Sequence, residues 1–114
     1  MSRVYVPATL HLLGDYRDAG QVPEHAERLV AVDDSEESEY DALLAAADAS
    51  ALLVGDVGRR VVVVAEVADV DAAFAMSEVV AVHVDTEALD LSGDPGDLPD
   101  LGWFATQEIG DLLV

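Results

Sequence analysis

The feature that most constrains this chain is the apolar run within Arg59–Val67, which reads Arg-Arg-Val-Val-Val-Val-Ala-Glu-Val. Four consecutive β-branched residues favour an extended backbone, because their χ1 freedom is poor in a helix. The run does not alternate apolar and polar residues, so both faces of the strand need cover. This is typical of a central strand between layers of helices. We therefore expect the rest of the chain to be arranged around this strand.

Further strands and helical segments are expected on both sides of this run. The predicted strands lie at Arg3–Val6, Glu27–Val32, Ser77–Val84 and Leu101–Thr106. The predicted helices lie at Leu10–Asp18, Asp33–Gly55, Asp69–Met76 and Gln107–Val114, with about one helical turn in Asp85–Leu91.

The clearest of these helices is Asp33–Gly55. Asp34 and Glu37 have the spacing of a capping box, in which each side chain satisfies an unpaired backbone N–H. Asp41 and Asp48 are expected to face water. One apolar stripe at helical spacing is expected to face the core, and it consists of Tyr40, Leu43, Leu44, Ala47 and Ala51.

The order of these elements predicts the fold class. Strands that alternate with helical segments favour an α/β fold, a single domain over residues 1–114 with a mostly parallel sheet of about five strands and helices packed on it. The alternative is a two-layer α+β arrangement, a split βαβ fold of the ferredoxin-like type, with helices on one face only. The chain has no cysteine, which excludes disulfides and thiolate metal sites.

The charge balance limits the kinds of partner. The sequence has 24 acidic residues against five arginines and no lysine, for a net charge of −19. Nucleic acid and anionic membranes are poor partners, because both need a cationic surface. Three interpretations stay open: a solvated acidic surface, which we favour, adaptation to high salt, or a surface that meets cationic partners or metal ions.

The hydrophobic segments indicate where the protein resides. The longest apolar runs, Ala42–Ala47 and Val61–Ala65, are far shorter than the roughly 20 residues that a membrane span needs. The first residues, Met1–Tyr5, lack the apolar region of a signal peptide. We expect a soluble protein in the cytoplasm.

Acidic residues near the predicted strand ends suggest a metal site. In a parallel sheet the carboxyl ends of the strands share one edge, where ligands usually bind. Asp33, Glu66, His83 and Asp85 would gather there, and His83 and Asp85 would point to one face. Such oxygen ligands suit Mg²⁺ or Mn²⁺. The competing interpretation, which we favour, is chance, because acids are frequent in this chain and aspartates are ordinary helix caps.

Trp103 and Phe104 are the candidate contacts for a partner. As neighbours on a strand they should point to opposite faces. One ring is expected in the core, and the other is a candidate anchor for a protein partner or a second copy of the chain. We favour the interpretation that helices cover both rings, because large aromatic residues are usually well buried.

Several segments together resemble a known family. They are Arg3–Thr9, Glu37–Ala47, Arg59–Val67, Val82–Asp85 and Trp103–Ile109, of which the last is the most specific. They are similar to a family of small uncharacterised proteins of actinobacteria, classed as a domain of unknown function. The resemblance supports the fold prediction and implies no activity, cofactor or catalytic residue.

Two functions are compatible with these observations. The first is an acidic interaction or regulatory module without catalysis and without a bound organic cofactor. We favour it because no Gly-x-Ser-x-Gly motif or glycine-rich phosphate loop is present. The alternative is a small Mg²⁺- or Mn²⁺-dependent enzyme of the phosphoester hydrolase type at the Asp33, Glu66, His83 and Asp85 edge.

Overall fold

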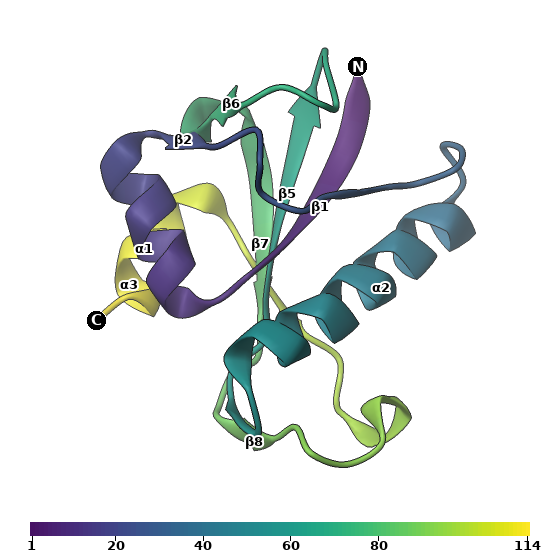
Figure 1. Ribbon diagram of the computed structural model, residues 1–114, viewed down its shortest axis with the longest axis vertical. Coiled ribbons are helices and arrows are strands. Elements are labelled where there is room, and N and C mark those ends of the chain that lie inside the picture. Colours follow the sequence, from purple (N-terminus) through teal and green to yellow (C-terminus); the bar gives the residue numbers. More distant parts are fainter.

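A five-stranded antiparallel sheet lies at the centre of the computed structural model, which describes residues 1–114 (Figure 1). Its strands have the order β3-β1-β5-β7-β9. They span Ser2–Ala8 (β1), Leu29–Val30 (β3), Val61–Val67 (β5), Val79–Val84 (β7) and Gly102–Phe104 (β9).

Two small ribbons and the helices complete the chain. One ribbon pairs β2 (Gln21–Val22) with β6 (Phe74–Ala75), and the other pairs β4 (Val57–Gly58) with β8 (Leu89–Asp90). The α-helices are α1 (Leu10–Ala19), α2 (Glu36–Val54) and α3 (Ile109–Leu112), and the 3₁₀ turns are Met76–Glu78, Pro95–Asp97 and Thr106–Glu108.

β5 is the central strand, as the valine run predicted. It pairs with β1 along its full length, from Ser2 opposite Val67 to Ala8 opposite Val61. On its other side it pairs with β7, with a register shift between Val64 and Ala65. All four valines of the run are buried, which agrees with a strand that is covered on both faces.

The two faces of the sheet carry separate cores. On one face, the α1 face, residues such as Val4, Val61 and Val82 pack with Leu13 of α1 and Ile109 of α3. The other face, the α2 face, packs against α2, and its core consists of Tyr5, Val62, Val64, Ala42, Ala46 and Ala47. Figure 1 shows α1 and α3 together on one side of the sheet and α2 on the other.

The predicted mostly parallel sheet is wrong. Every adjacent pair in the sheet is antiparallel, so the protein has an α+β fold. The predicted helix at Asp69–Met76, which would have carried a parallel crossover, is instead β6 paired with β2, followed by a 3₁₀ turn. The alternative names the α+β class correctly but is wrong in its layers. The unit β3-α2-β5 is a split βαβ, with β1 between its strands, but helices cover both faces of the sheet.

The buried side of α2 differs from the predicted stripe. Small residues face the sheet, namely Ala42, Ala46, Ala47 and Ser50, while Tyr40 and Leu44 stay 50% and 43% exposed. The helix begins at Glu36, three residues later than predicted, and its N-cap is Ser35 instead of Asp34; the Ser35 hydroxyl accepts from the backbone N–H of Ser38. The predicted exposure of Asp41 and Asp48 is confirmed.

Ser50 explains this orientation of α2. Its hydroxyl donates to the Ala8 carbonyl at 2.7 Å and accepts from the Val61 N–H at 2.8 Å. The side chain is fully buried, so it ties the helix to the ends of β1 and β5. Ala46 and Ala42 lie four and eight residues earlier on the same side of the helix, and their small size lets the helix approach the sheet closely.

We predict that Ser50→Ala lowers the free energy of unfolding by about 1–3 kcal/mol, because two buried backbone groups lose a hydrogen-bond partner. Urea denaturation measures this change. The matched control is Ser77→Ala at an exposed position, which should stay within about 0.5 kcal/mol of the wild type. Equal stability of the two variants would show that Ser50 does not fix α2.

Candidate functional site

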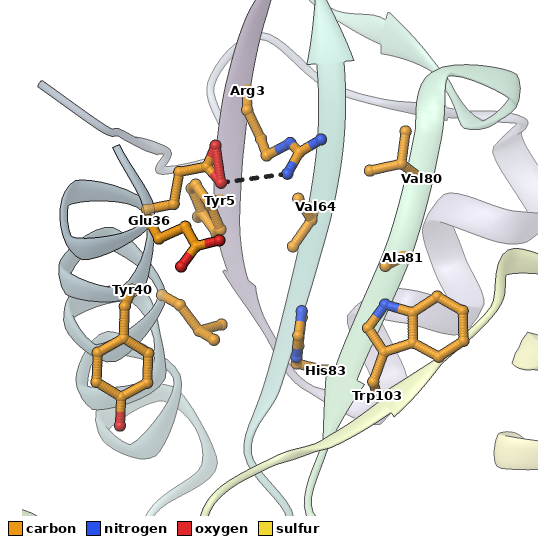
Figure 2. Close-up of a pocket in the computed structure, with 11 residues that line it drawn as sticks. Arg3, Tyr5, Glu36, Tyr40, Val64, Val80, Ala81, His83 and Trp103 are labelled. Atoms are coloured by element: carbon orange, nitrogen blue, oxygen red, sulfur yellow. Dashed lines mark hydrogen bonds and ion pairs between the residues drawn. The ribbon is translucent and has the colours of Figure 1, made fainter. Parts of the chain in front are cut away.

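A groove runs along the α2 face between α2 and the strands β7 and β9. We call it the α2 groove. One part has a volume of about 440 Å³ and includes Tyr5, Val64, Ala81, His83 and Trp103 from the sheet (Figure 2). A second part of about 380 Å³ continues toward the loop at 95–101. The two parts share Tyr40, Leu43, His83 and Trp103.

The groove exists because α2 covers only half of this face. The helix packs chiefly on β1, β5 and β3. β7 and β9 therefore lack a helix on this side. Trp103 lies directly opposite His83 in the β7–β9 ladder and is 62% exposed. Val80 is 40% exposed and has no partner in the β5–β7 register, so it is a β-bulge, a device that redirects side chains.

Acidic side chains lie at both ends of the α2 groove. Glu36 and Glu39 line one end, and Asp48 and Asp100 line the other. The two arginines that line the groove are already paired within the protein. Arg3 donates to Glu66 at 2.6 Å and to Glu39 at 3.4 Å, and Arg60 pairs with Asp85. The groove is therefore apolar in its middle and negative at its ends.

His83 lies in the middle of the groove and belongs to both of its parts. Burial lowers the pKa of this imidazole, because a charged ring loses its hydration there. The ring is therefore neutral at neutral pH, with one nitrogen able to donate a hydrogen bond and the other able to accept one. It adds no positive charge to the groove under these conditions.

The structure separates the residues of the predicted metal site. Glu66 lies beside Arg3 at one end of β5, and Asp85 lies beside Arg60 at the other. Six residues of strand between these ends correspond to about 20 Å. Asp33 is exposed and accepts from the Ser35 N–H at 2.9 Å; hydrogen bonds from Ser35 lower the pKa of Asp33. No group of three or more His, Asp or Glu residues that could hold a metal ion is present.

The expected convergence relied on parallel strands, whose carboxyl ends share an edge. In the antiparallel sheet, adjacent strands end at opposite edges, so β5 and β7 separate Glu66 from Asp85 and the convergence that suggested a phosphoester hydrolase is missing.

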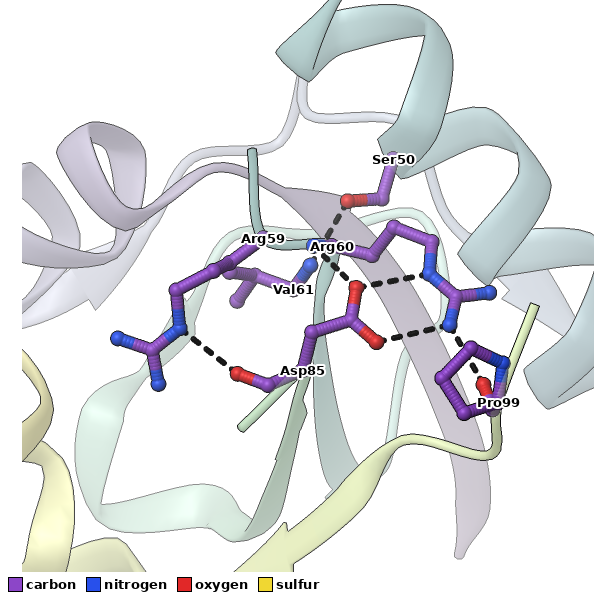
Figure 3. Close-up of polar contacts among 6 residues, drawn as sticks. All are labelled: Ser50, Arg59, Arg60, Val61, Asp85 and Pro99. Carbon is purple, nitrogen blue, oxygen red and sulfur yellow. Dashed lines mark hydrogen bonds and ion pairs between the residues drawn. The ribbon is translucent and has the colours of Figure 1, made fainter. Parts of the chain in front are cut away.

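Asp85 is part of a buried polar network (Figure 3). Its Oδ2 accepts from the backbone N–H and the Nε of Arg60, each at 2.8 Å, and its Oδ1 accepts from Arg60 Nη2 at 2.8 Å. Arg60 also donates to the Pro99 carbonyl at 2.7 Å, and Arg59 donates to the Asp85 carbonyl at 2.7 Å. The Asp85 side chain is only 1% exposed. These contacts tie β5 and β7 to the loop at 95–101, which lines one end of the α2 groove.

Trp103 and Phe104 point to opposite faces of the sheet. Phe104 packs against the core of the α1 face. Trp103 is exposed on the α2 face, so the favoured expectation that helices cover both rings does not describe the structure. Sequence reasoning missed Tyr40 and Leu44 as groove residues, because it placed both in the core. The signal that identifies the packed side of α2 is the small-residue spacing of Ala42, Ala46 and Ser50.

Comparison with known proteins identifies one family. A family model described as a family of unknown function (DUF6912) matches residues 2–113. No curated protein matches the chain, and no solved structure matches it. Among the helices, none combines the length and the apolar character that a membrane crossing requires. The description of the family names no activity.

We predict that Asp85→Asn lowers the free energy of unfolding by about 3–5 kcal/mol, because it leaves the buried Arg60 charge without a counterion. Urea denaturation measures this loss. Asp97→Asn, at an exposed position in the nearby loop, is the matched control and should stay within about 0.5 kcal/mol. A loss in Asp85→Asn no larger than in the control would mean that the ion pair does not hold this region together.

The lowered pKa of His83 gives a second prediction. Below the unfolded value of about 6.5, the unfolded chain binds a proton that the folded chain resists, so this residue's contribution to stability falls as the pH drops. As the pH falls from 8 to 5.5, the wild type should therefore lose unfolding free energy relative to His83→Gln. Urea titrations at several pH values measure it. A difference that is constant with pH would contradict the burial of this ring.

Proposed function

We propose a function for this chain, which belongs to DUF6912, a family of unknown function, from the shape and charge of its α2 groove. The protein is an acidic interaction module, and the α2 groove binds a cationic segment of a partner protein. The cytoplasmic location and the actinobacterial origin expected from the sequence are part of this proposal.

The observation that carries the proposal is the exposed apolar strip along the groove. Tyr40 on α2 and Trp103 on β9 line both parts of the groove. Leu44 lines the part near the loop at 95–101, and Val80 lines the other part. All four side chains are exposed. Contiguous exposed apolar residues with a polar rim mark interaction surfaces. Trp and Tyr are the residues most enriched among binding hot spots, so Trp103 and Tyr40 are the expected anchors.

The charge selects the kind of partner. Two copies of a chain with a net charge of −19 repel each other, which disfavours a homodimer through this surface. Nucleic acid and anionic membranes are disfavoured for the same reason. A cationic protein segment is attracted by this charge and can pair with Glu36, Asp48 and Asp100 at the groove ends. Of the three interpretations of the charge, the groove supports a surface that meets cationic partners.

Selection from a random peptide library displayed on phage tests this proposal. Peptides enriched by the wild type should carry a net positive charge and an apolar anchor. Trp103→Ala should lose this enrichment, because it removes the largest exposed anchor. Leu52→Ala should keep it, because Leu52 is 87% exposed on α2 but does not line the groove.

The selection can also overturn the proposal. Enrichment of neutral or acidic peptides, the absence of any enrichment, or equal enrichment by Trp103→Ala and Leu52→Ala would each show that the α2 groove is not a docking surface for cationic segments.

A further inference from the structure

We infer that the segment bound in the α2 groove is an amphipathic helix with basic residues, which lies beside α2 over β7 and β9. This inference rests on the proposed function and adds the conformation of the partner. Three features of the groove support it: the width of the uncovered sheet, the apolar ridge of α2 and the positions of the acidic residues.

The width of the uncovered sheet matches one helix. α2 packs chiefly on β1, with β3 and β5 on its two sides. β7 is two strands away from β1, which corresponds to about 9.5 Å at the usual strand spacing. Packed helices have axes about 8–10 Å apart. A helix in contact with α2 would therefore lie over β7, with β9 beside it, and would complete the helical layer of this face.

The wall of the groove has the surface that packs against a helix. Tyr40 and Leu44 are four residues apart on α2, as are Leu43 and Ala47, and all four line the groove. Rows of side chains at this spacing form the ridges that fit between the side chains of a neighbouring helix. Tyr40 and Leu44 lie outside the buried side of α2, so the row that these two residues form has no partner within the chain.

The acidic residues fit the length of a helix. Glu36 lines one end of the groove and Asp48 the other. These residues are 12 positions apart on α2, which corresponds to about 18 Å. A partner helix of about 12 residues therefore spans the groove, and basic residues near its two ends reach these carboxylates.

A strand is the other conformation that a bound segment can take. An extended peptide would pair with the open edge of β9, the last strand of the sheet. β9 contains only three residues, Gly102–Phe104, so it offers a short ladder of backbone hydrogen bonds. That ladder would also leave the ridge of α2 uncovered. The structure therefore favours the helix.

Three synthetic peptides of identical composition, built from leucine, alanine and lysine, test the inference. The first places leucine at helical spacing, and the second alternates leucine with lysine as in a strand. The third keeps the helical order of the first. Each peptide carries one proline, which lies at the end of the first two peptides and in the middle of the third. Trp103 is the only tryptophan of the protein, so its fluorescence reports on the groove, and calorimetry gives the affinities.

The helical peptide should bind at least tenfold more tightly than the other two, because a central proline breaks a helix. Leu44→Gln should weaken its binding about tenfold, while Leu52→Gln on the same helix should not change it. Both leucines are exposed, and urea denaturation verifies that both variants fold.

The outcomes separate this inference from the proposed function. Equal binding of all three peptides, or tightest binding of the alternating peptide, would overturn the helical conformation of the partner. The proposal that the groove binds a cationic segment would still stand. Binding of no peptide, or binding that Trp103→Ala leaves unchanged, would overturn both.

Discussion

The structure depends on the burial of β5 on both of its faces. Val61, Val62, Val63 and Val64 are all buried, and they alternate between the two cores. Each face of the sheet therefore needs a layer of its own. α1 and α3 provide this layer on one face, but α2 alone provides it on the other. Since α2 lies over β1 and β5, the surface of β7 and β9 remains open, and the α2 groove is a direct consequence.

The chain has only five arginines against 24 acidic residues, and Arg3, Arg28 and Arg60 make contacts within the fold. Arg60 is buried against Asp85, and Arg3 bridges Glu39 and Glu66. Arg28 donates to the carbonyls of Pro23, Ala26, Val70 and Ala72, and it lies over the ring of Phe74. These cations hold loops and strands together, and few remain to neutralise the surface acids. The carboxylates of the groove are therefore the groups that the proposed cationic segment would meet.

The sequence predicts the elements of this fold better than their directions. Consecutive valines determine that β5 is extended and covered on both sides, but such a run occurs in parallel and antiparallel sheets alike. The direction depends on the connections, and Phe74 pairs with Val22 in a small ribbon instead of joining a helix. The site was harder to predict. Hydropathy cannot show which side of α2 is buried, because Ser50 sets that orientation through two contacts distant in sequence. The metal prediction relied on parallel strands, and the antiparallel sheet places Glu66 and Asp85 at opposite ends of β5.

The open side of the sheet also needs protection from self-association. An edge strand that carries an exposed tryptophan, as β9 does, is a template for pairing with another copy. β9 is short, which limits such a ladder, and the net charge of −19 keeps copies apart. The same charge attracts a cationic segment over a distance of about one Debye length, near 8 Å at physiological salt. The net charge of −19 thus opposes pairing with a second copy and attracts the cationic segment that we propose for the groove.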